Sequence, residues 1–565
     1  MKRSTILTCL VVLGSNARVV AQYPPVPWAY GFGASSQDFG RDVVLDPAGN
    51  TVALGDFFGT VDGDPGVNAN PLVSAGGADI YVVKLDPQGQ HVWSFRLGST
   101  APEYAAAIAT DAQGNVFVTG LFSGATDFDP GPGTVSLTNV GDQDIFILKL
   151  DADGIFQWVR HYGGPYSDEV ADMVVDPAGN VLVTGLLSGT VDMDPGPNIF
   201  NLDLGRFLVK LDPAGDLVWA EKPLVNAEAF GMCSDAAGAI YLVGRFGATS
   251  DFDPGPDTAA FTAVGSVDIF VSKLDANGAF VWARAMGGPN DDKANAVAVD
   301  TLGNVFVTGM FRDSCNFDPG VSDFTLTTVG NIDVFTMRLN ADGSFAWAFR
   351  IGGATASTDE GYGIAVDAVG HVYTTGELLG TSDMDPGPGT FTLSTGSTTA
   401  LYVQCVGTDA AFHWAFKVSA GSFYYNSGRA IVVDGTGNAR VTGCFEFINV
   451  DFDPGAAVLN LSAAGIDDAF VMAIGPAGPL GLEGMRPEQE RSVLYPDPAH
   501  GQFVLGCNTD RATLELLDAV GRVVFTAQLH QGLNTVDVPT HLSGMFACRL
   551  RDGVRVIASD RLVLQ

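Results

Sequence analysis

The chain has 565 residues, 46% of them hydrophobic, and its 29 Lys and Arg against 64 Asp and Glu give a formal net charge of −35. The hydrophobic content is sufficient for a sizeable core, and the β-branched and aromatic residues between the 70 glycines argue against disorder. The negative charge argues against binding to nucleic acid or to anionic membrane surfaces, since both favour basic proteins.

The N-terminus has the pattern of a secretory signal peptide over residues 1–21. Lys2 and Arg3 precede an apolar stretch from Ile6 to Leu13, and Ala21 supplies a small residue before a cleavage point at Gln22. No later run approaches the roughly 18 apolar residues of a membrane-spanning helix, so we expect no transmembrane segment.

An internal repeat occupies residues 22–478. All seven tryptophans recur roughly 65 residues apart, at Trp28, Trp93, Trp158, Trp219, Trp282, Trp347 and Trp414. Each is followed by an aspartate, and two glycines follow that aspartate at fixed spacing, as Gly114 and Gly120 follow Asp111. The chain therefore contains seven equivalent modules, and such arrays bind ligands more often than they carry one catalytic constellation.

One module contains four short apolar stretches without helical periodicity. In the second copy we expect strand A up to Asp111, strand B from Val116, strand C over 145–150 and strand D around Trp158, with tight turns at DAQGN and DADG. Seven four-stranded modules predict a β-propeller, with a parallel solenoid as the alternative.

The two ends of the array favour the propeller. Trp28 belongs to a D strand with no A, B or C strand before it, whereas the last copy has A, B and C but no D. The segment around Trp28 is expected to complete the blade that begins near Gly428, which removes the open sheet edges of a linear array. The predicted fold class is all-β, a seven-bladed β-propeller closed by its N-terminal strand.

The most suggestive motif is D-x-D-P-G between strands B and C. Carboxylates two positions apart in an extended chain point to the same side, and calcium prefers such oxygen ligands. Calcium binding, capping of the turn by the carboxylates and direct contact with a ligand all remain open. The candidate residues are Asp62, Asp64, Asp127, Asp129, Asp192, Asp194, Asp251, Asp253, Asp318 (after Asn316), Asp383, Asp385, Asp451 and Asp453.

Other acidic residues should lie near this motif. Strand direction places the B–C and D–A connections on one face of the ring, which we therefore expect to be strongly acidic and to form the contact surface. The acids concerned begin strand C (Asp79, Asp144, Asp268, Asp333, Asp468) or precede strand A (Asp38, Glu103, Asp168, Asp291, Asp292, Asp359, Glu360).

The residues after the repeat form a different module. Residues 479–491 have the Pro, Gly and charge content of a linker, and residues 492–565 read as alternating strands of a small β-sandwich. Cys507 and Cys548 lie in this module and their pairing stays open, whereas Cys233, Cys315, Cys405 and Cys444 fit buried free thiols.

Two family resemblances follow from these residues. The unit DxxGNVFVTG…DIFxxKLDxxGxxxW resembles the SBBP β-propeller repeat over residues 28–478, although Gly407 and Gly475 depart from it. The segments SVLYPDPAHGQFVL, ATLELLDAVGRVVF and GLNTVDVPTHLSGMFACRL resemble the type A C-terminal sorting domain of type IX secretion. That resemblance implies a Gram-negative envelope, contact with the type IX machinery, and a product that is released or attached to the outer-membrane surface.

These observations favour a secreted or surface-attached binding or structural module whose ligand is an unidentified extracellular glycan or protein. The seven histidines are scattered and no serine lies in a G-x-S-x-G motif, so we predict no catalytic residue and no cofactor other than calcium. The alternative is an extracellular polysaccharide lyase or hydrolase. An enzyme should break the repeat with His, Arg, Tyr or Lys near the ring centre, and the only departure noted is a shortened loop around Asn201–Arg206.

Overall fold

The computed structural model describes residues 23–476 apart from 67, 319–322, 354–357, 419–425, 447 and 456, together with separate strand segments between 494 and 564. One compact unit spans Gln22–Ala477, and a second includes Gly478–Gln565. The described residues form strands and contain no helix. The predicted signal peptide and linker lie outside the described residues.

Seven four-stranded antiparallel sheets make up the first unit. Their A strands are β2 (Phe39–Leu45), β8 (Tyr104–Thr110), β14 (Glu169–Val175), β20 (Ala227–Ser234), β26 (Lys293–Val299), β30 (Glu360–Val366) and β34 (Ser427–Val433). Their B strands are β3 (Thr51–Phe57), β9 (Val116–Phe122), β15 (Val181–Leu187), β21 (Ile240–Phe246), β27 (Val305–Asn316), β31 (Val372–Asp383) and β35 (Ala439–Phe445).

The outer half of each sheet comes from strands C and D. The C strands are β6 (Asp79–Leu85), β12 (Asp144–Leu150), β18 (Gly205–Leu211), β24 (Asp268–Leu274), β28 (Thr325–Leu339), β32 (Thr392–Val406) and β38 (Asp468–Ile474). The D strands are β7 (His91–Leu97), β13 (Phe156–Tyr162), β19 (Leu217–Glu221), β25 (Phe280–Met286), β29 (Phe345–Ile351), β33 (Phe412–Val418) and β1 (Trp28–Phe32). The order A-B-C-D holds in all seven sheets.

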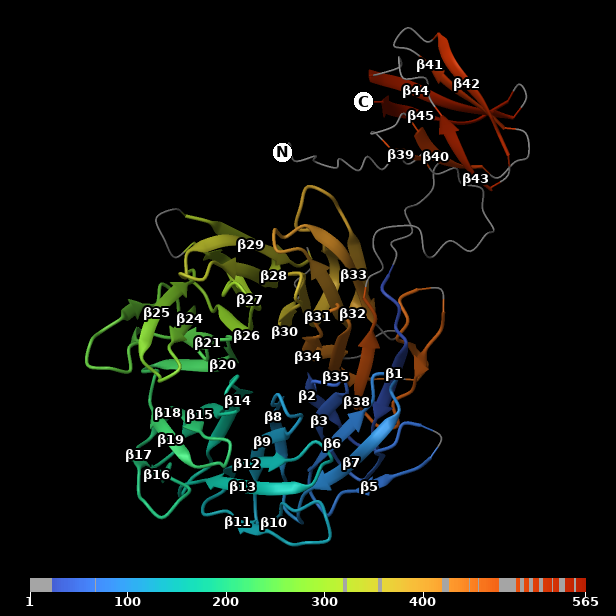
Figure 1. Ribbon diagram of the computed structural model, residues 1–565. Helices are drawn as coiled ribbons and strands as arrows, with labels where there is room; N and C mark the ends of the chain where they lie inside the picture. Colours follow the sequence, from blue (N-terminus) through green and yellow to red (C-terminus); the bar gives the residue numbers. More distant parts are fainter. Residues whose placement is uncertain are drawn as a thin grey trace. The chain divides into compact units, whose positions relative to one another are not determined.

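The seven sheets close into a ring. Neighbouring A strands contact one another in the circuit β2, β8, β14, β20, β26, β30, β34 and back to β2, and Figure 1 shows them around the centre of the ring. The last sheet has the order β1-β38-β35-β34, with Trp28 opposite Ala473 and Phe32 opposite Ala469. This confirms the seven-bladed β-propeller and its closure by the N-terminal strand.

The B–C connections contain an element that the sequence pattern did not reveal. In five blades a two-stranded ribbon extends each connection: β4–β5 (Thr60–Asp62, Pro71–Val73), β10–β11 (Ala125–Asp127, Ser136–Thr138), β16–β17 (Val191–Asp192, Asn201–Leu202), β22–β23 (Thr249–Asp251, Ala260–Thr262) and β36–β37 (Val450–Asp451, Asn460–Leu461). In blades 5 and 6 the long strands β27, β28, β31 and β32 provide the same extension. The D-x-D-P-G motif stands at the outer end of each ribbon.

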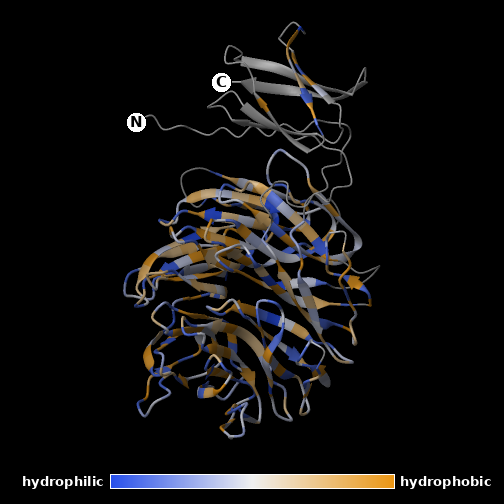
Figure 2. Cartoon of the chain, turned by 45° about the vertical axis from the view of Figure 1, so that its right-hand side comes forward, coloured by the Kyte–Doolittle hydropathy of each residue, from blue (hydrophilic) through white to orange (hydrophobic). Residues whose placement is uncertain are grey.

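Hydrophobic clusters lie between adjacent blades. One of them joins Trp28 and Phe32 of the last blade to Phe57 and Tyr81 of the first, so the closing strand contributes to the core. Figure 2 shows hydrophobic residues concentrated in the strands and hydrophilic residues mostly in the loops. Cys315, Cys405 and Cys444 are buried free thiols as predicted, and Cys233 is free and half-buried.

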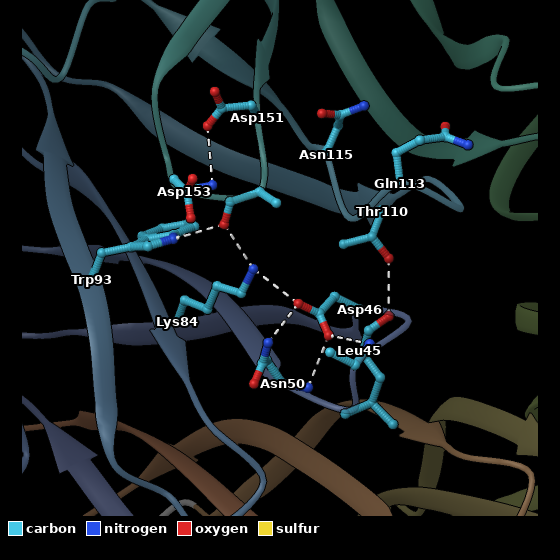
Figure 3. A network of polar contacts seen from close by, with 12 residues as sticks. Leu45, Asp46, Asn50, Lys84, Trp93, Thr110, Gln113, Asn115, Asp151 and Asp153 are labelled. Atoms are coloured by element: carbon cyan, nitrogen blue, oxygen red, sulfur yellow. Dashed lines mark hydrogen bonds and ion pairs between the residues drawn. The ribbon is translucent and has the colours of Figure 1, made fainter.

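The A–B turn and the tryptophan link neighbouring blades (Figure 3). Asp46 Oδ1 accepts the amides of Ala48 and Asn50, both at 2.9 Å, which confirms the turn role of this repeated aspartate. Asp46 Oδ2 lies 2.8 Å from Lys84 Nζ, and both side chains are buried. Lys84 Nζ and Trp93 Nε1 also donate to the Ala152 carbonyl of the next blade, at 2.9 and 3.2 Å.

The second unit contains two sheets. The first has the order β39-β40-β43 and the second β42-β41-β44-β45. Their strands are β39 (Leu494–Asp497), β40 (Gln502–Cys507), β41 (Ala512–Leu517), β42 (Val523–Leu529), β43 (Gly532–Asp537), β44 (Gly544–Asp552) and β45 (Arg555–Leu564). Cys507 and Cys548 lie in different sheets, and their pairing concerns side chains outside the described residues.

Candidate functional site

The D-x-D-P-G loops share one hydrogen-bonding pattern. The first carboxylate accepts the amide of the second aspartate and an amide eight positions on, as Asp127 Oδ1 does from Asp129 (3.2 Å) and Val135 (2.8 Å). The second carboxylate accepts a glycine amide two positions on, as Asp129 Oδ1 does from Gly131 at 2.8 Å. The pattern recurs at Asp62/Asp64, Asp192/Asp194, Asp251/Asp253, Asp383/Asp385 and Asp451/Asp453, and Asn316 replaces the first aspartate before Asp318.

The residue between the two aspartates is a core residue. Phe128 is fully buried, and its ring centroid lies 5.3 Å from that of Phe122 and 4.9 Å from that of Phe146. The equivalent side chains, also fully buried, are Met193, Phe252, Phe317, Met384 and Phe452, with Gly63 in the first copy. Alternation along the chain thus places an apolar side chain in the blade and two turn-capping carboxylates outside it.

The described geometry shows turn capping by these pairs. Calcium takes six to eight oxygen ligands, and one oxygen of each aspartate carboxylate is already bonded to backbone amides. Among the residues that the structure describes, no three His, Cys, Asp or Glu side chains form a group suited to a metal. Calcium at the D-x-D-P-G loops stays a prediction.

The acids before strand A and at the start of strand C do not form an exposed acidic surface. Most are buried, with exposed fractions of 0–3%: Asp38, Glu103, Asp168, Asp292 and Asp359, and Asp79, Asp144, Asp268, Asp333 and Asp468. The expectation that these side chains create an acidic contact face is therefore wrong. Strand direction predicted the face to which they belong, but not that their loops fold inward over them.

Asp38 illustrates how these acids join consecutive blades. Its carboxylate accepts the amides of Ala34 at 2.6 Å and Phe58 at 2.7 Å, and its own amide donates to the Asp467 carbonyl. Burial, together with the nearby Asp468 and Asp467, raises the pKa of Asp38 to about 6 despite these amide bonds. Burial likewise raises the pKa of Asp292 to about 7, with a contribution from Asp268.

These acids occur in pairs across the blade junctions. Register matching places the strand-C aspartate of one blade beside the acid that leads into the next: Asp79 with Glu103, Asp144 with Asp168, Asp268 with Asp292, Asp333 with Asp359 and Asp468 with Asp38. The other two junctions lack both acids and carry Gly205 with Ala227 and Ala400 with Asn426. The two positions change together, so each pair behaves as one structural unit.

The junction between blades 3 and 4 departs furthest from the repeat. Arg206 lies opposite Leu186, at a position where the other six blades have a buried aliphatic side chain. Those residues are Ile80, Ile145, Ile269, Val334, Leu401 and Ala469, each 0–1% exposed, whereas the Arg206 side chain is 20% exposed. A charged group at this position has no counterpart in the repeated core.

Arg206 belongs to a network along the innermost strands. Its Nη2 lies 2.5 Å from Glu228 Oε1, Arg245 Nη2 lies 2.7 Å from Glu228 Oε2, and Arg206 Nη1 lies 3.6 Å from Glu169. We call the set Glu169, Arg206, Glu228, Phe230, Arg245, Lys293, Glu360, Tyr362 and Arg429 the inner network.

The inner network continues through the later blades by ring and ion contacts. Arg245 and Lys293 lie over the Phe230 ring at 5.3 and 5.4 Å from its centroid. Lys293 Nζ is 2.6 Å from Glu360 Oε1, and Arg429 lies 4.2 Å from the Tyr362 centroid. Side chains that vary within the repeat thus form a series of contacts through blades 3 to 7, mostly on the A strands.

An open groove of about 940 Å³ adjoins this network. Its lining includes Leu204, Arg206, Lys222, Glu228, Arg245 and Asp291, from both sides of the junction between blades 3 and 4. Two short connections border the groove. The B–C connection of blade 3 (192–205) has four residues fewer than that of blade 2 (127–144). The segment from blade 3 into blade 4 (219–235) has two residues fewer than the segment from blade 2 into blade 3 (158–176). We call this groove the interblade groove.

The shortened loop around Asn201–Arg206 was the one departure visible in the sequence, and it does border the groove. Arg245, Lys293, Tyr362 and Arg429 were missed. Each occupies a column whose residue varies among the blades. The bulged column of strand A, for example, reads Arg41, Ala106, Ala171, Phe230, Asn295, Tyr362 and Arg429. Aligning the copies position by position is the signal that would have found them.

Comparison with known families finds a match within each of the two units. Residues 281–310 match the model described as beta-propeller repeat (SBBP), and residues 493–565 match the secretion system C-terminal sorting domain. The chain carries an SBBP repeat and a type IX sorting domain. A sorting domain of this kind implies export and interaction with the secretion machinery. Among the described residues no helix has the length and hydrophobicity needed to cross a membrane.

Curated relatives are distant. An uncharacterized WD repeat-containing protein of Acanthamoeba polyphaga mimivirus is 20% identical over 550 residues, covering 80% of this chain and 38% of that protein. The regulatory protein FlaEY of Caulobacter vibrioides is 28% identical over 159 residues, covering 27% and 16%. The chain therefore spans well under half the length of these relatives.

Solved structures of similar type are also distant. The Swd1 β-propeller domain of Myceliophteria thermophila has a TM-score of 0.37 and 7% identity, over 79% of this chain and 99% of that chain. PorZ, a surface component of the Porphyromonas gingivalis type IX secretion system, has a TM-score of 0.18 and 11% identity, over 95% and 100%. The propeller assignment rests on the strand order of this chain itself.

Proposed function

We propose that this protein is an exported propeller that binds an extracellular glycan or protein through the interblade groove and the adjoining inner network. The sorting domain delivers it to the outside of a Gram-negative cell, where it is secreted or attached to the outer-membrane surface. The propeller supplies the ring, and the junction between blades 3 and 4 supplies an opening where both connecting loops are short.

The observation that supports this proposal is the position of Arg206. Placing a guanidinium at a core position costs stability unless it is well paired, and six blades avoid it. The site keeps Arg206 partly exposed in a groove whose volume is in the range of small-ligand pockets. A departure from the repeat that serves no evident packing role is the feature expected of a binding site.

Arrays of extracellular glycans and matrix proteins test the proposal. The full chain is compared with Arg206→Ile, which restores the residue type of the other blades and is expected to fold normally, and with Arg284→Leu as a control. Arg284 lies on strand D and donates to the Gly343 carbonyl at 2.9 Å, away from the groove. We expect Arg206→Ile alone to lose the bound ligand, and equal binding by all three proteins would contradict the proposal.

The same arrays address the enzymatic alternative. A polysaccharide lyase or hydrolase would release new sugar ends from a bound glycan, whereas a binding module leaves the glycan intact. Product release that Arg206→Ile abolishes would favour the enzyme over the binding module.

A further inference from the structure

Two guanidinium groups in the groove share one carboxylate. Arg206 and Arg245 both direct donors at Glu228, one on each of its carboxylate oxygens. One carboxylate balances one of the two positive charges, and each planar guanidinium has five donors, so donors remain for another acceptor. The second carboxylate that touches Arg206, Glu169, is 60% exposed and 3.6 Å away, which makes it a weak partner.

The rim of the groove adds a third cation and apolar surface. Lys222 is exposed on the connection between blades 3 and 4. Leu204 and Val225, on either side of the groove, are 66% and 54% exposed. Asp291, also in the lining, offers a hydrogen-bond acceptor. Arg206, Lys222 and Arg245 thus gather in one groove of a chain that has only 29 Lys and Arg and a net charge of −35.

We propose that the interblade groove binds an acidic polysaccharide and that a uronate carboxylate of the ligand lies against Arg206 and Arg245. This inference rests on the proposed binding function and names its ligand class. Guanidinium pairs recognise planar carboxylates bidentately. Asp291 accepts from sugar hydroxyls, and the exposed Leu204 and Val225 side chains pack against the C–H faces of the sugar rings.

The charge of the whole protein sets the conditions for binding. A net charge of −35 repels a polyanion over long distances at low ionic strength. The Debye length falls from about 30 Å at 0.01 M salt to about 8 Å at 0.15 M, which screens the distant charges while the contacts within the groove persist. Affinity should therefore be higher at 0.15 M than at 0.01 M salt, opposite to a simple surface ion pair.

Calorimetric titration of the full chain with oligogalacturonate tests the inference, and its methyl ester is the matched neutral ligand. We expect the acid form to bind at least tenfold more tightly than the ester. Arg206→Ile and Arg245→Leu, which restore residues found in other blades, should each weaken binding of the acid form by at least tenfold. Arg284→Leu should bind as the unchanged protein does, and melting temperatures confirm that every variant is folded.

The outcomes separate the ligand class from the binding function. Equal affinity for acid and ester, both lost in Arg206→Ile, overturns the acidic class and leaves the groove as a glycan site. Acid-specific binding that survives both groove variants overturns the location and with it the proposed site. Absence of binding to either form by the folded protein overturns the inference, while a protein ligand found on the arrays would still support the binding function.

Discussion

Trp28 stands directly opposite Ala473 in the ladder between β1 and β38, so the beginning of the repeat region pairs with its end. Trp28 Nε1 also donates to the Pro87 carbonyl of the first blade at 3.4 Å. One short strand thus completes the last sheet and contacts the first.

Substitution within this closing strand should destabilise the whole ring. Phe32 is 1% exposed, and Phe32→Ala should lower the free energy of unfolding by about 3–5 kcal/mol through lost burial and a cavity. Denaturant unfolding followed by tryptophan fluorescence measures the change. Phe200→Ala is the control, since Phe200 is 43% exposed and should cost under about 0.5 kcal/mol. Equal effects of the two substitutions would contradict closure by β1.

Removal of Lys84 should leave a buried charge unpaired. The Lys84 and Asp46 side chains are each 4% exposed and lie 2.8 Å apart, so Lys84→Met should cost about 3–5 kcal/mol. Asp216→Asn breaks the exposed pair with Arg160, whose atoms lie 3.7 Å apart, and should change stability by under about 0.5 kcal/mol. Chemical denaturation of both variants provides the test. A cost for Lys84→Met as small as that of the control would show that the pair does not tie the turn to strand C.

The D-x-D-P-G loops offer a contrast between the apolar residue and its flanking acids. Phe128→Ala should cost about 3–5 kcal/mol because it empties a fully buried site. Asp127→Asn should cost under about 1 kcal/mol, since Asn316 Oδ1 already accepts the equivalent amides of Asp318 and Phe324 at 3.1 Å in blade 5.

Thermal melting of these loop variants with calcium and with a chelator examines the calcium prediction. Turn capping alone predicts the same melting temperature in both buffers. A rise of several degrees with calcium that Asp127→Asn reduces would instead support calcium at these loops.

Stability should decrease as the pH rises from mildly acidic to neutral. Burial raises the pKa of Asp38 from 3.8 to about 6 and that of Asp292 to about 7. Between pH 4 and these values the folded state keeps protons that the unfolded state releases, so the free energy of unfolding falls with rising pH. At about 1.36 kcal/mol per pKa unit, these shifts correspond to about 3 kcal/mol for Asp38 and about 4 kcal/mol for Asp292.

At lower pH, protonation of other carboxyls decreases the stability of the folded protein. Burial pushes the pKa of Asp46 up, but hydrogen bonds from Lys84 and Asn50 bring it below its usual value, so its contribution is lost in acid. Urea unfolding at pH 4.5 and 7.5 should show higher stability at pH 4.5, and the double variant Asp38→Asn, Asp292→Asn should reduce the difference. Higher stability of the unchanged protein at pH 7.5 would mean that these buried acids do not govern the dependence.

The features that were predictable from the sequence are local and repeated. The aspartate and glycine of each A–B turn act within their own loop. The Gly114 amide, for example, donates to the Asp111 carbonyl, and Gly114 has a positive φ of 81°. The spacing of these residues therefore revealed the hairpins and the blade count. Burial was not predictable in the same way. Whether Asp38 faces solvent depends on the fold of the loop from Ala34 and on the position of Phe58, which follows strand β3. The groove is harder still to predict from the sequence, because it arises where two shortened loops meet across a blade junction.

Binding of an acidic sugar by the residues between blades 3 and 4 can be observed at atomic resolution. A crystal structure of the full chain with an oligogalacturonate tests it most directly. We expect a sugar in the interblade groove with its carboxylate within hydrogen-bonding distance of Arg206 and Arg245. A sugar bound instead at the D-x-D-P-G loops or on the D strands, with the groove empty, would contradict it.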